Sequence, residues 1–328
     1  MDVTNSTTAA VALHQAVICV AFTLIFLIGL LGNGMVIWII LCTMKQRFPT
    51  VILILNLAVA DFSVLITLPF WIYSYGDRWV FGASFCTGLL YLVHSTMFAS
   101  VFFIMVMSIE RLVAVLYPFT AQKCWRHGLV RNAIIMVWAI SFLLAVPVLT
   151  ERRAAQAETP HCSQLQDSSQ QQEGLLLFET LVGFAIPFLT LSVCNALVAK
   201  RIDRMTFQGK SKSVNVTIRV TIAFAVCWLP YHIRNLFIIS SALSKSSSPE
   251  ASKMLLQLAE KIENLVGALA VSNSCINPIL YAFAARRIQN NFMISGIAKL
   301  FQQLHNSSAN KYAKESTSRR ANSQQSSC

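Results

Sequence analysis

Seven long stretches of this chain consist almost entirely of apolar residues, and polar segments separate them. A helix needs about 20 such residues to cross the roughly 30 Å of hydrocarbon in a bilayer. The stretches lie at 16–42, 51–74, 88–110, 132–150, 175–199, 218–241 and 262–285. This pattern predicts an all-α membrane protein that folds as a bundle of seven transmembrane helices.

The segments around the bundle predict three further parts. Residues 1–15 are mostly polar and precede the transmembrane domain at 16–285. Residues 286–305 place apolar side chains at helical spacing beside basic ones, which predicts a short amphipathic eighth helix on the membrane surface. The last residues, 306–328, are rich in Ser, Asn and Gln and predict a disordered cytoplasmic tail.

Composition supports the membrane assignment, and charge orients the chain. Hydrophobic residues make up 55% of the chain and charged residues only 12%, which excludes an ordinary soluble domain. Of the 26 Lys and Arg residues, 18 fall in the tail and in the loops opposite the N-terminus, against six in the other loops. Because cytoplasmic loops carry the excess of Lys and Arg, we expect an extracellular N-terminus in the plasma membrane. The net charge is +12, and we expect these basic residues to contact anionic lipid of the inner leaflet. We do not expect nucleic-acid binding.

Two cysteines and one asparagine lie on the predicted extracellular side. Cys86 and Cys162 are the two of the nine cysteines on that side, and the oxidising conditions there favour a disulfide between them. Asn5 begins an Asn-Ser-Thr sequon, so we expect it to carry a glycan. The sequence contains no metal-ligand spacing, nucleophile motif or phosphate-binding loop, and we therefore expect no enzyme activity.

Asp61 is the most costly residue inside the apolar stretches, because an acid near mid-membrane costs roughly 2.5 to 3.5 kcal/mol. It needs polar partners, and several polar residues recur at one-turn steps on other spans. The candidates are Asn33, Thr96, Ser100, Asn273, Asn277 and Tyr281. Two interpretations stay open: a structural hydrogen-bond network, or a cation or proton site whose occupancy biases the conformation.

Three other motifs place charged residues or a proline within a span or at its end. Glu110-Arg111 stands where the third span meets the cytoplasm, as a terminal ion pair or as a functional switch. Pro230 follows Trp228 and Leu229 in the sixth span, and Pro278 follows Asn277 in the seventh. A proline inside a helix bends it, so we expect both spans to bend, which would let one end swing.

Together these motifs resemble, in order and position, those of rhodopsin-like G-protein-coupled receptors. The resemblance covers residues 16–305. It rests on Gly32-Asn33, Leu57 to Asp61, Cys86, Glu110-Arg111, Trp138, Pro187, Cys227-Trp228-Leu229-Pro230 and Asn277-Pro278-x-x-Tyr281. It implies a seven-helix receptor that binds an extracellular ligand and opens an inner cleft for a heterotrimeric G protein.

The same resemblance implies roles for individual residues. It implies an allosteric sodium ion held by Asp61, Ser100, Asn273 and Asn277. It implies switch and G-protein-coupling roles for Glu110, Arg111, Phe119, Trp228, Pro230, Pro278 and Tyr281.

Within that family, other segments resemble leukotriene B4 receptors, which are chemoattractant receptors for a dihydroxy fatty acid. These segments include Trp79 to Gly82, Leu144 to Leu149, Glu179 to Leu181 and Trp228 to His232. The resemblance implies leukotriene B4 as ligand and chemotaxis as the response. A chemoattractant peptide is the alternative ligand, and an ion-conducting or transporting protein that uses the polar residues around Asp61 is the alternative class.

An amphipathic acid needs a cation for its carboxylate and apolar or aromatic walls for its chain. Trp228, Tyr231 and Asn235 share one helical face, whereas Arg234 lies about 100° off it. We expect the ligand at Tyr91, His94, Arg152, Glu179, Trp228, Tyr231, His232 and Asn235. Arg152 as a solvated loop base, His94 as a satisfied bundle histidine and Glu179 as an interhelical acid remain alternatives.

Several positions depart from the patterns of this family. Asn195 stands where a tyrosine is usual, and Glu263 stands where leukotriene B4 receptors are basic. Val93 and Val271 replace the aspartate of amine receptors and the lysine of opsins, which argues against both classes.

The cytoplasmic side carries two further expectations. The short loop at 200–219 and the subfamily resemblance suggest an inhibitory-type G protein. Serines and a threonine near Arg319 and Arg320 suggest kinase sites that recruit arrestin. Ordinary disorder explains that composition equally well.

Overall fold

The computed structural model describes residues 2–44, 49–76, 79–117, 127–149, 162, 170–203 and 212–286. These residues are helical almost throughout and include no strand. The helices are α1 (Asp2–Trp38), η1 (Ile39–Thr43), α2 (Pro49–Leu65), α3 (Leu68–Gly76), α4 (Ala83–Leu116), α6 (His127–Leu144), α8 (Gln170–Phe178), η2 (Glu179–Ala185), α9 (Ile186–Asp203), α10 (Lys212–Ser244) and α11 (Pro249–Arg286).

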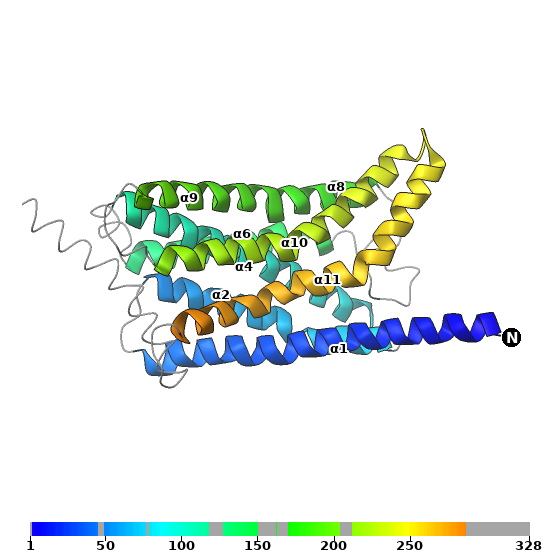
Figure 1. Ribbon diagram of the computed structural model, residues 1–328, viewed down its shortest axis with the longest axis horizontal. Helices are drawn as coiled ribbons and strands as arrows, with labels where there is room; N and C mark the ends of the chain where they lie inside the picture. Colours follow the sequence, from blue (N-terminus) through cyan, green and yellow to red (C-terminus); the bar gives the residue numbers. More distant parts are fainter. Residues whose placement is uncertain are drawn as a thin grey trace, which may run out of the picture.

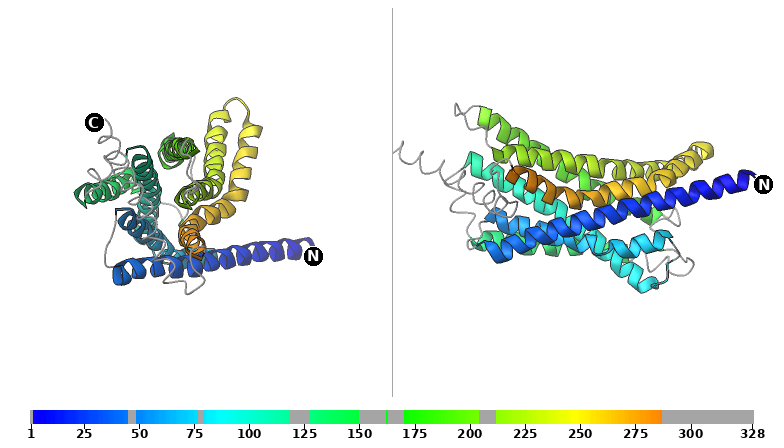
Figure 2. Two further views of the ribbon diagram at one scale, coloured as in Figure 1. Left: turned by 60° about the vertical axis from the view of Figure 1, so that its left-hand side comes forward. Right: turned by 60° about the horizontal axis from the view of Figure 1, so that its bottom comes forward.

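These helices form seven rods in the described part of the chain: α1 with η1, α2 with α3, α4, α6, α8 with η2 and α9, α10, and α11. Six of the rods are long and apolar enough to cross a membrane, and α11 is the seventh. The rods run side by side, with α1 along one side of the bundle (Figures 1 and 2). The predicted seven-helix fold is confirmed.

The two ends of the bundle are named here after residues of α4. The Cys86 end is where α4 begins, and the Glu110 end is where it ends. At the Cys86 end, the hairpin formed by α10 and α11 and the N-terminal part of α1 both project, on opposite sides of the bundle (Figure 1).

Large apolar side chains are exposed on the outer surface of the bundle. Leu31, Leu143 and Leu189 are 70%, 69% and 63% exposed. One buried core cluster joins residues of α2, α4, α6, α9, α10 and α11, including Phe103 and Phe224, which have no exposed surface. A helix bundle that exposes large apolar side chains all round is suited to hydrocarbon rather than water.

Two helices begin well before the apolar stretches that predict them. Helix α1 begins at Asp2 rather than at residue 16, and α11 begins at Pro249 rather than at 262. The residues ahead of Gly29 include no proline or other glycine that would end α1. Pro249 is favourable as the first residue of α11 because its missing N–H is not needed there. The hydropathy of the sequence therefore locates the part of a helix that can lie in a membrane, but it does not locate the ends of the helix.

Close contact between α1 and α11 places the last rod in the bundle. A Cβ atom added at Gly32 would lie 2.9 Å from Pro278 Cβ, and one at Gly29 would lie 2.7 Å from Cys275 Sγ. Such approaches are too short for any side chain, so both glycines are needed where the two helices touch. The segment after Arg286, which contains the predicted eighth helix and tail, lies outside the described residues.

Candidate ligand cavity and polar seam

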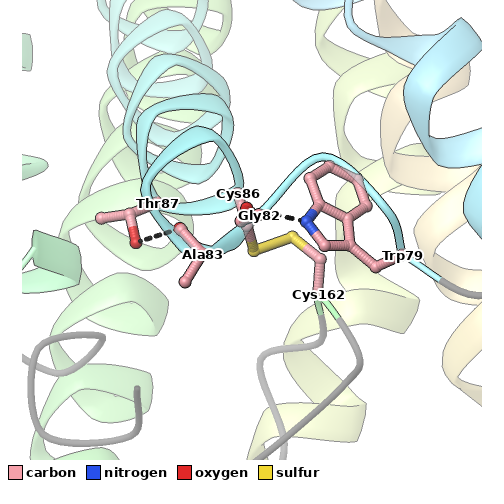
Figure 3. Close-up of a disulfide and its surroundings, with 6 residues drawn as sticks. All are labelled: Trp79, Gly82, Ala83, Cys86, Thr87 and Cys162. Carbon is pink, nitrogen blue, oxygen red and sulfur yellow. Dashed lines mark hydrogen bonds between the residues drawn. A yellow bond between two sulfur atoms is a disulfide. The ribbon is translucent and has the colours of Figure 1, made fainter. Parts of the chain in front are cut away.

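A disulfide ties the segment between α6 and α8 to the start of α4. Cys86, in the first turn of α4, is bonded to Cys162 as predicted (Figure 3). Beside it, the indole N–H of Trp79 donates a hydrogen bond of 2.9 Å to the carbonyl oxygen of Gly82. Gly82 has a φ of 80°, which a residue with a side chain rarely adopts. These contacts fix the position of the chain segments at the Cys86 end of the bundle.

A cavity of about 450 Å³ lies between α2–α3, α4, α10 and α11 toward the Cys86 end. Its size falls in the range of small-molecule sites. Aromatic side chains form much of its wall: Trp71, Tyr75, Trp228 and Tyr231. Its polar lining includes His94, Arg234, Glu263 and Asn264, with Ser100, Asn273 and Ser274 from the polar residues deeper in the bundle. It is therefore amphipathic, with a few polar groups among apolar walls.

Three predicted ligand residues, His94, Trp228 and Tyr231, line this cavity. Glu179, His232 and Asn235 are buried but are not among its lining residues. Arg152 lies outside the described residues, as do Phe119 and the side chains of Asn5 and Tyr281.

Tyr91 was expected in the cavity, and this expectation is wrong. Its hydroxyl donates a hydrogen bond of 3.0 Å to the carbonyl oxygen of Phe142 on α6. Its ring stacks on that of Phe142, with 6.3 Å between the centroids. The side of α4 that carries Tyr91 packs against α6, so the residue serves helix packing.

Glu179 contacts two residues that line the cavity, His94 and Tyr231. Its Oε1 lies 2.9 Å from His94 Nε2, and the Tyr231 hydroxyl donates to its Oε2 at 3.3 Å. The other ring nitrogen of His94 lies 2.7 Å from the carbonyl oxygen of Leu90. Both ring nitrogens of His94 therefore face oxygen atoms. The acid thus joins α4 to α10 and fixes two side chains that line the cavity.

Asp61 is fully buried below the cavity. The Ser100 hydroxyl donates to its Oδ1 and the Asn277 amide to its Oδ2, both at 2.9 Å. Asn273 is buried one turn above Asn277 and reaches the cavity floor. Asp61 and these three residues form a polar seam that leads from the cavity toward the Glu110 end.

Two other candidate partners of Asp61 have different hydrogen bonds. The Asn33 amide donates to the carbonyl oxygen of Ser274 at 2.8 Å, and so joins α1 to α11. The Thr96 hydroxyl donates to the carbonyl oxygen of Leu92 in its own helix at 2.8 Å.

Side-chain hydrogen bonds join neighbouring rods toward the Glu110 end. The Thr50 hydroxyl donates to Glu110 Oε1 at 2.8 Å, which ties α2 to α4. The Asn195 amide donates to the Thr221 hydroxyl at 2.8 Å, which ties α9 to α10. Asn195, the departure from the family pattern, therefore has a specific partner on the helix that carries Pro230.

Arg234 reaches the cavity, whereas Asn235 does not, and the face expected from regular helical spacing is wrong here. Pro230 lies within α10 between Trp228 and Arg234. A signal was present in the sequence, because an arginine inside an apolar span needs a partner. That partner is Glu263, whose Oε1 lies 3.0 Å from Arg234 Nη2.

Comparison with known proteins gives a family match over most of the chain. The family model described as 7 transmembrane receptor (rhodopsin family) matches residues 32–281. Leukotriene B4 receptor 1 of Homo sapiens is 32% identical over 278 residues, which are 84% of this chain and 78% of that receptor. Apelin receptor B of Danio rerio is 31% identical over 321 residues, 92% and 88% of the two chains. Formyl peptide receptor 2 of Mus musculus is 30% identical over 308 residues, 89% and 85% of the two chains.

Proposed function

Because the chain belongs to the rhodopsin family of seven-transmembrane receptors, we propose that it binds an extracellular chemoattractant and signals to a heterotrimeric G protein from the plasma membrane. The Cys86 end faces outward in this proposal, and the N-terminus is extracellular. The distribution of Lys and Arg supports that orientation, because the loops and tail at the Glu110 end carry the excess.

The proposed ligand is leukotriene B4, an amphipathic dihydroxy fatty acid. The observation that carries this proposal is the cavity: its aromatic walls suit a hydrocarbon chain, and Arg234 offers positive charge for a carboxylate. Similarity to leukotriene B4 receptor 1 over 84% of the chain supports the same ligand. A chemoattractant peptide is the second candidate, because receptors named for apelin and formyl peptides are also similar.

We propose that Asp61, Ser100, Asn273 and Asn277 hold an allosteric sodium ion. Each carboxylate oxygen of Asp61 accepts one of the two hydrogen bonds described above, and a carboxylate can accept about four. Oxygen ligands from a carboxylate, a hydroxyl and amides suit a hard cation. An ion-transport function would need flux through this seam, and ion flux through reconstituted vesicles would favour that alternative.

We propose that the G protein binds at the Glu110 end of the bundle. Glu110 and Arg111 lie at the cytoplasmic end of α4 in this orientation, and inhibitory-type G proteins are the proposed partners. Arrestin would follow phosphorylation of the Ser- and Thr-containing tail.

The decisive experiment is nucleotide exchange on purified G protein, with the receptor in lipid nanodiscs. Leukotriene B4 should accelerate exchange, and Arg111→Ala should abolish the acceleration while ligand still binds. Formyl peptides and apelin are tested in parallel. Absence of stimulation at saturating leukotriene B4 would reject this ligand, and stimulation by a peptide alone would favour the second candidate.

A further inference from the structure

A cationic side chain stands on the cavity wall with its charge only partly paired. Arg234 is 2% exposed, and it lies one turn beyond Tyr231 toward the Cys86 end of α10. Its Nη2 meets Glu263 of α11 at 3.0 Å, and its Nη1 donates to Asn235 Oδ1 at 3.3 Å. Its buried Nε has no hydrogen-bond partner among the described residues. A guanidinium has five N–H donors, so this one can donate hydrogen bonds to a further anion.

The two partners of this ion pair differ in how easily each can leave. The Glu263 side chain is 37% exposed, whereas that of Arg234 is 2% exposed. A partly exposed carboxylate that turns away regains water, but a buried guanidinium left without an anion is strongly destabilising. An incoming anion would therefore displace Glu263 and leave Arg234 in place.

The other acids near the cavity have partners in the interior. Glu179 lies against His94, and Asp61 lies below the floor with Ser100 and Asn277. Glu263 is thus the acid that both lines the cavity and remains partly open to solvent.

We propose that Arg234 anchors the carboxylate of a long-chain acid, and that Glu263 occupies this anchor as an internal substitute until the ligand displaces it. Arginine binds carboxylates through two parallel hydrogen bonds. The acid group would sit at the level of Arg234, and the chain would run past Tyr231 toward Trp228 and the cavity floor. Glu263 would then lower affinity for every acid that uses the anchor. This inference rests on the proposed function, because it assumes that the cavity is a receptor site.

The main test is Glu263→Gln, which keeps the shape of the side chain and removes its charge. The variant should bind leukotriene B4 about tenfold more tightly than the parent receptor, because the competing charge is gone. Leukotriene B4 methyl ester lacks the anion, and its affinity should not change. Glu260→Gln is the matched control, since Glu260 is an exposed acid on the same helix and does not line the cavity.

Arg234→Gln should produce the opposite effect, with weaker binding of the acid and unchanged binding of the ester. Surface expression of this variant identifies a folding defect, and Arg234→Lys should restore part of the acid affinity. If Glu263→Gln leaves acid affinity unchanged or lowers it, the anchor proposal is wrong. The same holds if it weakens binding of a cationic peptide, because Glu263 would then be a ligand contact.

Failure of the proposed ligand can be separated from failure of the anchor. Arachidonate and methyl arachidonate are added to the parent receptor and to Glu263→Gln, and thermal unfolding is measured. The anchor predicts that the acid stabilises Glu263→Gln more than the parent and that the ester does not. This outcome with no response to leukotriene B4 would reject that ligand and support the anchor. No greater stabilisation of Glu263→Gln by arachidonate would reject the anchor.

Discussion

At the scale of single residues, three acids of this bundle have different kinds of partner. Asp61 is held by neutral donors, Glu179 by an imidazole ring and Glu263 by a guanidinium. Neutral donors leave a carboxylate available for a cation, whereas a base satisfies its charge. The same residue type therefore supports an ion site in one place and a structural support in another.

Glu179→Gln should destabilise the receptor by about 1–3 kcal/mol, because the buried side chains of His94 and Tyr231 lose the carboxylate that both contact. Thermal unfolding in detergent measures the effect. The double variant with His94→Gln should recover much of the loss, since the buried ring nitrogen that lost its partner is also removed. Normal stability with weakened ligand binding would instead identify Glu179 as a direct ligand contact.

At the scale of helices, two kinds of contact hold the rods in register. Glycines allow α1 and α11 to touch, and side-chain hydrogen bonds join α9 to α10. The first kind is permanent packing. The second can break when a helix end moves.

Gly32→Ala tests the packing contact. The added methyl group would meet Pro278 Cβ at 2.9 Å, and forcing the helices apart should cost about 1–3 kcal/mol. Gly34→Ala is the control, because its nearest neighbour would be Phe62 at an ordinary 3.6 Å. Equal thermal stability of the two variants would contradict the close α1–α11 contact.

Asn195→Ala tests the breakable contact. Loss of the hydrogen bond to Thr221 should release α10 at its Glu110 end and raise ligand-independent nucleotide exchange by about fivefold, for a bond worth about 1 kcal/mol. Thr190→Ala, which removes a hydroxyl bonded within α9 itself, should leave basal exchange unchanged. Equal basal exchange in both variants would mean that this tie does not restrain α10.

At the scale of the whole molecule, a set of polar residues leads from the cavity floor toward the Glu110 end. The cavity floor includes Ser100 and Asn273, and the seam continues through Asp61 to Asn277, beside Pro278. An ion in the seam would stabilise one arrangement of α2, α4 and α11. By linkage, it would then change agonist affinity at the cavity.

Asp61→Asn should abolish the effect of sodium on agonist binding. Sodium should lower agonist affinity of the parent receptor on the order of fivefold, and the variant should bind equally in sodium chloride and in choline chloride of the same ionic strength. Sodium sensitivity that persists in Asp61→Asn would place the ion elsewhere.

Much of this architecture follows from the sequence alone. The apolar stretches determine the spans because hydrocarbon accepts no unsatisfied backbone. Cys86 and Cys162 pair as expected, and Asp61 needs the hydrogen bonds that Ser100 and Asn277 provide. These outcomes depend on residue chemistry and solvent, which the order of residues carries directly.

The tertiary structure decided which side chains face the cavity. Tyr91 turned to α6, Arg234 rather than Asn235 reached the ligand space, and Glu263 on α11 became the partner of Arg234. Regular helical spacing shows which residues share a face, but it does not show which neighbouring helix or cavity that face contacts. Rotation, bending and the approach of neighbouring helices, down to the contact at Gly32, arise when all the rods pack together.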